Sequence, residues 1–341
     1  MSSRPSRITV NPCRHAPDRF RLIRVELSNA QAIQSKGECM RYTNLAKTIS
    51  LGLALTFAIV LGLGAVDAVA DEAKAKESYN IGVESMKEGK YNDAILAFRQ
   101  ALTEDPEYVD AYINLGAALY QTRKFAEALD AFQNATEKAP DNVDAWLNYG
   151  RVNYVLKKYG DAELAFKQAI ELAPTNADLY KELGKVYYKQ RQYDNVISSL
   201  QACHENGGGD FLTWFMLGKA YEKQDQTTQA INAFQKSIEA RSSNYNAYFA
   251  LGQIYLNQEK FMKAADMYDK ALEADPQKFR AAYNYAVAIE SADPDAIDRN
   301  IAAWQSFVKI AKGNPKAKRD LDIAIAHIED LQERKELLES N

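Results

Sequence analysis

The chain contains 341 residues, of which 26% are charged and 47% hydrophobic, and these fractions exclude a fibrous or wholly disordered protein. Residues 1–70 carry nine Lys and Arg against four Asp and Glu, whereas residues 71–341 carry 33 against 42, a net charge of −9. A body this acidic repels nucleic acid and anionic lipid unless its basic residues are concentrated in one place. We therefore expect no nucleic-acid partner.

Residues 1–39 are rich in arginine and show neither a helical nor a strand period, so we expect a non-native upstream extension or a disordered segment. The residues just before Met40 can be encoded by a purine-rich run that resembles a bacterial ribosome-binding site, which favours Met40 over Met1 as the initiator. A bipartite organelle presequence is the alternative, although the three acidic residues in this segment are unusual for one.

Residues 40–70 have the three parts of a secretory signal peptide. Two basic residues precede a stretch without charge at 49–66, and Ala68-Val69-Ala70 follows as a cleavage motif. The sequence therefore predicts export to a bacterial periplasm or cell envelope, with cleavage after Ala70. An uncleaved anchor stays open, because the apolar stretch approaches the roughly 20 residues that cross a bilayer. We expect membrane contact only through this segment.

From Ala75 the chain repeats every 34 residues, in the windows 75–108, 109–142, 143–176, 177–210, 211–244, 245–278 and 279–315. The eighth position of the windows holds Gly82, Gly116, Gly150, Gly184, Gly218, Gly252 and Ala286. A strict period of this length is typical of stacked supersecondary units rather than of one closed core. Such an array offers an extended surface to a partner.

Each window predicts two antiparallel helices, because its apolar residues recur three and four positions apart. Glycine inside a helix costs about 1 kcal/mol relative to alanine, so the repeated glycine implies that a neighbouring helix comes close. Alanines at positions 20 and 27 and a large ring at position 24 fit the same packing. Proline ends the second helix in four windows, at Pro106, Pro140, Pro174 and Pro276.

These positions, together with aromatic residues at position 4 such as Trp146, resemble the tetratricopeptide repeat (TPR) family over residues 75 to about 315. The resemblance implies an all-α, right-handed superhelical solenoid of helix-turn-helix repeats, about seven TPRs, within residues 71–315. Residues 316–341 follow as an amphipathic C-terminal capping helix. Its apolar residues are Leu321, Ile325, Ile328, Leu331 and Leu338.

Two windows depart from the pattern. The fourth has Val196, Leu200 and Cys203 in place of Ala, Phe and Ala, and Gly207-Gly208-Gly209 in place of proline, which predicts either a joint or a tolerated degenerate repeat. The seventh carries a five-residue insertion. There we expect Asp293-Pro294 to open the second helix as its N-cap and first residue.

Sequence motifs for catalysis, metals or cofactors are absent. Two histidines follow residue 70, His204 and His327, too far apart in sequence to pair, and Cys203 takes the place of a buried alanine, which predicts an inert core thiol. The glycine triplet lacks the strand and the Lys-Ser/Thr of a phosphate-binding loop. The sequence thus predicts a protein that is not an enzyme and uses no cofactor.

In the family that this chain resembles, positions 2, 5, 9 and 12 of the first helices typically line a concave groove, because they share one helical face. Position 9 supplies cations in three consecutive repeats, Arg151, Lys185 and Lys219, and Lys181 lies near them. Aromatic rings accompany them at Tyr120, Tyr154, Tyr188, Phe215 and Phe249. We expect these nine residues to bind a protein or peptide segment with acidic or aromatic side chains. Alternatively, the tyrosines fill gaps between helices and the lysines are ordinary surface.

Taken together, these features predict a non-enzymatic protein-interaction scaffold of the cell envelope. An accessory or assembly factor that recruits an enzyme of envelope, secretion or polysaccharide biogenesis is one alternative, and co-capture of that enzyme would distinguish it. A self-associating structural module that forms homo-oligomers is another, and a mass that rises with concentration would identify it.

Overall fold

The computed structural model describes residues 71–340, and every regular element in that range is a helix. Residues 73–341 form one unit with a core of its own. The predicted upstream extension, signal peptide and cleavage site lie outside the described residues. Within the described range, no helix combines the length and the apolar character needed to cross a membrane.

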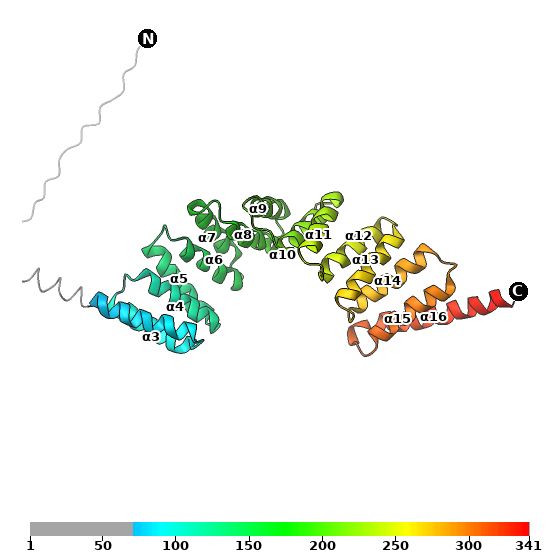
Figure 1. Cartoon of the computed structure of the whole chain (residues 1–341), viewed down its shortest axis with the longest axis horizontal. Coiled ribbons are helices and arrows are strands. Elements are labelled where there is room, and N and C mark those ends of the chain that lie inside the picture. Colours follow the sequence, from blue (N-terminus) through cyan, green and yellow to red (C-terminus); the bar gives the residue numbers. More distant parts are fainter. Residues whose placement is uncertain (1–70, 341) are drawn as a thin grey trace, which may run out of the picture. The chain divides into compact units, whose positions relative to one another are not determined.

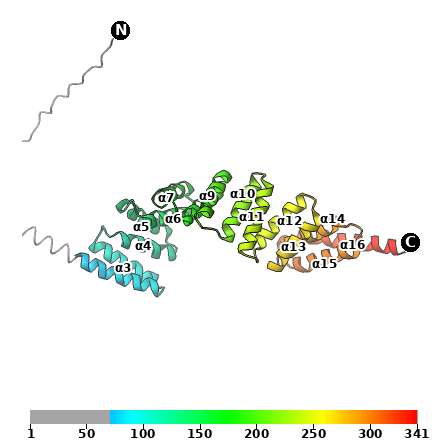
Figure 2. The ribbon, with the colours of Figure 1, turned by 45° about the horizontal axis from the view of Figure 1, so that its top comes forward.

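The helices pair in chain order, as Figure 1 and Figure 2 show from two sides. Helical residues 71–87 pair with α3 (Tyr91–Glu104). The pairs that follow are α4 (Val109–Gln121) with α5 (Phe125–Lys138), α6 (Val143–Val155) with α7 (Tyr159–Leu172), α8 (Ala177–Gln190) with α9 (Tyr193–Glu205), α10 (Phe211–Lys223) with α11 (Thr227–Ala240), α12 (Tyr245–Asn257) with α13 (Phe261–Ala274), and α14 (Phe279–Ala292) with α15 (Ile297–Ala311). A short 3-10 turn, η1 (Pro315–Ala317), leads into α16 (Lys318–Glu339).

Packing follows the chain, because each helix contacts the next one along the sequence. The first helices of consecutive repeats also touch, α4 with α6, α6 with α8 and α8 with α10. The prolines act as predicted, since α3, α5, α7 and α13 each end two residues before one. The all-α repeat solenoid with a C-terminal capping helix that the sequence predicts is confirmed.

The glycine at position 8 lies against the ring at position 24 of the same repeat. A Cβ added at Gly150 would lie 2.6 Å from Cε1 of Phe166, and one added at Gly218 would lie 2.6 Å from Cε1 of Phe234. Both rings are completely buried. The predicted close approach is therefore confirmed, and the neighbour that requires it is the second helix of the same repeat.

The core consists of local clusters, each built from neighbouring helices. One cluster joins α3 to α6, a second joins α7 to α11, a third joins α10 to α13 and the last runs from α12 to α16. The alanines at positions 20 and 27, such as Ala162 and Ala169, have no exposed surface, so the paired helices touch with nothing between them. Stability therefore depends on contacts between adjacent repeats.

The turn inside each of the first six repeats contains a residue in the left-handed backbone region at position 15. These residues are Gly89 (φ 74°), Arg123, Lys157 and Arg191 (φ 61° each), Asp225 (φ 56°) and Glu259 (φ 57°). The left-handed region costs a residue with a Cβ roughly 1–2 kcal/mol, whereas glycine adopts it freely. Five of these turns therefore hold a strained residue.

We predict that Lys157→Gly raises the free energy of unfolding by about 0.5–1 kcal/mol, because relief of the left-handed strain exceeds the added entropy of the unfolded chain. Urea denaturation of residues 71–341 measures it. Lys158→Gly is the matched control, since Lys158 has φ −81° and gains nothing from glycine. Equal stabilisation by both substitutions would contradict the backbone explanation.

The fourth repeat keeps the packing of its neighbours despite its unusual residues. Val196, Leu200 and Cys203 are each at most 1% exposed, at the positions that Ala, Phe and Ala occupy elsewhere. Gly207 turns the chain with φ 81° after the end of α9. The structure therefore favours the interpretation as a tolerated degenerate repeat.

The expectation that Asp293-Pro294 opens a helix is wrong. Asp293 is the C-cap of α14, its Oδ1 accepts from the Asp295 N–H at 3.3 Å, and α15 begins only at Ile297. The same turn follows α3 and α13, where Asp105 and Asp275 also precede proline. The carboxylate binds the backbone two residues on, so this Asp-Pro pair ends a helix instead of starting one.

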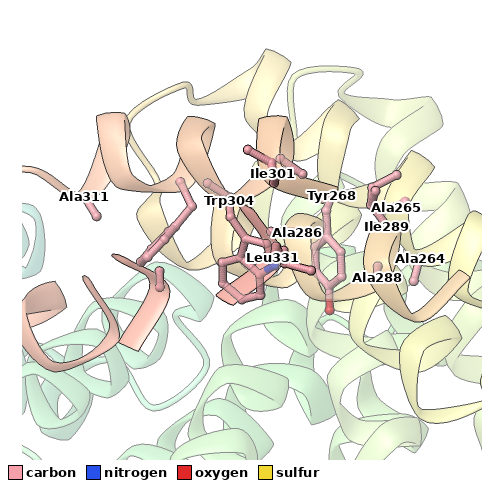
Figure 3. Packing of buried hydrophobic residues seen from close by; sticks show 14 of the residues in the cluster. Ala264, Ala265, Tyr268, Ala286, Ala288, Ile289, Ile301, Trp304, Ala311 and Leu331 are labelled. Carbon is pink, nitrogen blue, oxygen red and sulfur yellow. The ribbon is translucent and has the colours of Figure 1, made fainter. Parts of the chain in front are cut away.

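The capping helix α16 packs on α15 with only part of its expected apolar face. Leu331 is 2% exposed, and Leu321 and Ile328 pack against the same cluster, which Figure 3 shows around Trp304. Ile325 and Leu338, which the sequence placed on that face, are 42% and 62% exposed, because α16 packs mainly on α15 and η1 and reaches α14 through His327 and Glu290. Arg334 and Lys335 tie the helix to Asp295 and Asp298, at 2.7 and 2.6 Å.

Candidate functional site

We define the first-helix face as positions 2, 5, 9 and 12 of the first helix of each repeat, where the sequence places a partner. The three cations predicted at position 9 all lie on it, half-buried. Arg151 and Lys185 share one carboxylate, that of Glu182, at 3.2 and 3.0 Å. Lys219 binds both oxygens of Glu222 at 2.8 Å.

Lys181, the fourth predicted cation, is also paired. Its ammonium lies 3.3 Å from Asp210 and 3.5 Å from Asp178. Partial burial opposes ionisation of Asp210, but hydrogen bonds from the Thr213 backbone N–H and from Lys181 outweigh it and hold the pKa of that carboxyl below its ordinary value. The cations of repeats three to five therefore belong to a charge-balanced network, which sequence inspection missed because the partners come from other positions and from the next repeat.

The predicted tyrosines pack against the aromatic residue that begins the second helix of their own repeat. Ring centroids are 5.3 Å apart for Tyr120 and Phe125, 5.7 Å for Tyr154 and Tyr159, and 6.2 Å for Tyr188 and Tyr193, all edge-on. Partial burial raises the pKa of Tyr154 and Tyr188, so their hydroxyls remain hydrogen-bond donors at neutral pH. These rings brace the turn and leave part of their surface at the first-helix face.

Phe215 and Phe249 at position 5 are held in a similar way. Each packs 5.6 Å, centroid to centroid, from the position-24 ring of its repeat, Phe234 and Tyr268 respectively. Both remain half-exposed. The predicted rings are thus rigid and partly available to a partner, and the structure spreads them along several repeats instead of gathering them in one pocket.

A cavity of about 270 Å³ lies on the first-helix face of repeats six and seven, beside the start of α16. Phe249, Phe279 and Tyr283 supply its rings, and Gln253, Arg280, Asn284 and Asp320 its polar atoms. Arg280 is exposed, and within the described residues it forms no ion pair. Sequence reasoning missed Arg280 at position 2 because it ranked position 9, where the cations cluster.

Cys203 and His204 are adjacent near the end of α9, and neighbouring groups hold both side chains. Cys203 is 1% exposed, burial raises the pKa of its thiol, and its Sγ donates to the Gly208 carbonyl at 2.9 Å, as expected for a core thiol. His204 stacks on Trp214 with centroids 3.5 Å apart, and burial lowers its pKa. No group of acids, histidines and cysteines among residues 71–340 could hold a metal ion.

Family models for the tetratricopeptide repeat match residues 85–147, 118–177, 165–197, 215–279 and 249–315. The chain belongs to the tetratricopeptide repeat family. The matches leave out residues 198–214, the stretch with the glycine triplet at the end of the degenerate fourth TPR. TPR arrays are typically non-catalytic modules that bind proteins or peptides.

Solved structures of TPR proteins share the fold. The C-terminal part of a TPR repeat-containing protein from Cytophaga hutchinsonii matches with a TM-score of 0.60 at 19% identity, over 71% of this chain and 99% of that one. PilF of Pseudomonas aeruginosa matches with a TM-score of 0.52 at 16% identity, over 63% of this chain and 96% of that one. YrrB, a TPR protein with an unusual peptide-binding site, matches with a TM-score of 0.49 at 20% identity, over 56% of this chain and 98% of that one. No curated protein matches the chain.

Proposed function

We propose that this TPR protein is a non-enzymatic scaffold that holds an extended segment of a partner protein on its first-helix face. The observation that supports this most directly is the series of half-exposed rings at positions 5 and 12, each braced from behind by a second ring. A rigid, partly exposed aromatic side chain buries apolar area on binding at little cost in conformational entropy. A partner with apolar or aromatic anchor residues fits such a surface.

The cavity of repeats six and seven is the proposed centre of recognition. Phe249 and Tyr283 form apolar walls for a large side chain, and the unpaired Arg280 is placed to bind a nearby carboxylate of the partner. An acidic segment in repeats three to five, by contrast, must displace Glu182 and Glu222 from their cations. We therefore propose aromatic anchors with one acidic residue at Arg280, instead of a generally acidic partner.

Arg280→Glu is expected to weaken a peptide selected against residues 71–341 by at least about 10-fold, because it removes a charge pair and places like charges together. Fluorescence anisotropy of the labelled peptide measures the affinity, and circular dichroism checks that the variant remains helical. The control is the triple variant Arg151→Glu, Lys185→Glu and Lys219→Glu, whose larger charge change falls on the paired cations of repeats three to five and leaves the cavity intact.

The two variants separate the outcomes. Weaker binding by Arg280→Glu alone supports the cavity of repeats six and seven. Weaker binding by the triple variant alone moves the centre to the cations of repeats three to five that the sequence predicts. If the selected peptides bind both variants with the affinity of the wild type, the first-helix face is not the binding site.

We also propose that the protein works outside the cytoplasm, in the periplasm or cell envelope. The charge-free stretch at 49–66, its basic flank and the Ala68-Val69-Ala70 motif support this. The expected mature N-terminus is Asp71, and peptide mass analysis of the protein purified from its native cell identifies it. Peptides from residues 60–70 in the mature protein would indicate an uncleaved anchor instead.

A further inference from the structure

Six cations lie at the turns between the two helices of repeats two, three and four, five of them within the turns and Lys189 in the last turn of α8. We call them the basic edge: Arg123, Lys124, Lys157, Lys158, Lys189 and Arg191. All six side chains are exposed. The turns recur every 34 residues, and three of the six occupy the left-handed position of their turn, so the backbone presents them in the same way in each repeat.

The basic edge differs from the first-helix face in its pairing. Among residues 71–340 none of the six cations forms an ion pair, whereas Arg151, Lys181, Lys185 and Lys219 all do. The nearest acids along the chain open the following helices. Glu127 pairs with Arg99. Asp194 accepts from the neutral amide of Gln224 at 2.9 Å and keeps its charge, as does the exposed Asp161, so the six cations outnumber the nearby acids without an ion pair. The edge thus keeps a net positive charge on a body of net −9.

The charge of the turns changes along the array. The left-handed position carries Arg123, Lys157 and Arg191 in repeats two to four, but Asp225 and Glu259 in repeats five and six. The backbone is the same at all five positions, so folding does not require the difference. At the left-handed position of the turn, positive charge is therefore confined to repeats two to four.

We propose that the basic edge docks on a membrane surface of anionic phospholipid headgroups. Exposed cations on successive turns suit a broad layer of phosphates, where each Lys or Arg adds to the attraction independently of sequence. The repeats that carry them follow the charge-free stretch at 49–66 in the chain. Residues 71–210 as a whole carry 16 Lys and Arg against 23 Asp and Glu, so the proposed attraction is local to the basic edge and does not come from the net charge of these repeats. This proposal extends membrane contact beyond the segment to which sequence reasoning confined it, and it does not depend on the first-helix face.

Vesicle co-sedimentation of residues 71–341, which lack the apolar stretch, tests the edge alone. The expected result is binding to vesicles of phosphatidylcholine mixed with phosphatidylglycerol, loss of that binding at high salt, and no binding to pure phosphatidylcholine. The variant Arg123→Glu, Lys157→Glu and Arg191→Glu is expected to weaken the partition by at least on the order of 100-fold. The changes lie in exposed turns, and circular dichroism confirms the fold.

Two further variants sharpen the test. Asp225→Arg with Glu259→Lys extends the basic edge into repeats five and six and is expected to tighten binding to the anionic vesicles. The triple variant Arg151→Glu, Lys185→Glu and Lys219→Glu makes the same charge change as the edge reversal but on the first-helix face, and is expected to retain most of the binding. It also separates failure of this proposal from failure of the peptide site.

Absence of binding to the anionic vesicles at low salt overturns the proposal. Equal losses from the edge and first-helix variants overturn it too, because they would reflect net charge alone. In a third outcome, the wild-type protein binds an acidic protein through the edge and fails to bind the vesicles. If the edge reversal then abolishes binding of that acidic protein, the edge is a protein contact and the lipid assignment is wrong.

Discussion

Replacing Gly150 with alanine is expected to lower the free energy of unfolding by about 1–3 kcal/mol, although alanine is the better helix former. The new methyl group would lie 2.6 Å from Cε1 of Phe166, a ring that has no exposed surface and no room to retreat. The overlap forces the paired helices apart or the ring off its rotamer, and either response outweighs the gain in propensity. Urea denaturation followed by circular dichroism measures the change.

Gly160→Ala is the matched control, since Gly160 lies in the first turn of α7 and an added Cβ meets nothing within 4 Å. It is expected to stabilise by about 0.5–1 kcal/mol. Phe166→Ala alone is expected to cost about 3–5 kcal/mol, and in that background Gly150→Ala becomes neutral or favourable. A stabilising effect of Gly150→Ala with Phe166 intact would show that the ring does not dictate the glycine.

Trp304→Ala is expected to cost about 3–5 kcal/mol and to loosen the C-terminal end of the array. Trp304 is 5% exposed, lies 5.3 Å from the Tyr283 ring and 5.4 Å from the His327 ring, and donates through Nε1 to Glu290 at 2.8 Å. His327 contacts the same carboxylate at 2.9 Å. The indole of Trp304 in α15 thus contacts both α14 and the capping helix α16, and Figure 3 shows the cluster around it.

Hydrogen exchange read by mass spectrometry localises this effect, because a repeat array need not unfold in one step. Faster exchange in α14 to α16, with α4 to α7 unchanged, is the expected pattern. Leu338→Ala is the control, because Leu338 lies in α16 and is 62% exposed. This substitution is expected to change the free energy of unfolding by less than about 0.5 kcal/mol. If Trp304→Ala accelerated hydrogen exchange in α4 as much as in α14, the result would contradict a local role for Trp304.

Periodicity predicted the fold in detail, because each core position recurs at a fixed step. Helices α4, α6, α8, α10, α12 and α14 begin at the first residue of the windows set by Ala75 and the 34-residue step. Irregular positions were harder to predict. Asp293-Pro294 has the composition of a helix start, and only the hydrogen bond from the Asp295 N–H to the aspartate shows that it ends one.

The candidate site was predicted less well, since its electrostatics depend on pairing in space. Arg151 and Lys185 read as a free basic cluster in sequence, but both pair with Glu182, which lies between them. Conversely, Lys157 and Arg191 are spread out in sequence and lie in turns where they stay unpaired. A list of charges does not say which ones are neutralised, so both the Arg280 cavity and the basic edge required the structure.

Nearest-neighbour packing also determines how the molecule responds to heat. Because each cluster of buried residues involves only adjacent helices, melting can begin at one end while distant repeats stay intact. The three tryptophans of the chain, Trp146, Trp214 and Trp304, fall in repeats three, five and seven. Removing Trp304 would itself destabilise its end of the array, so all three indoles are kept. A separate fluorine-19 NMR signal from each labelled tryptophan would then report the melting temperature of its own repeat, and the differences between those temperatures would give the coupling between repeats.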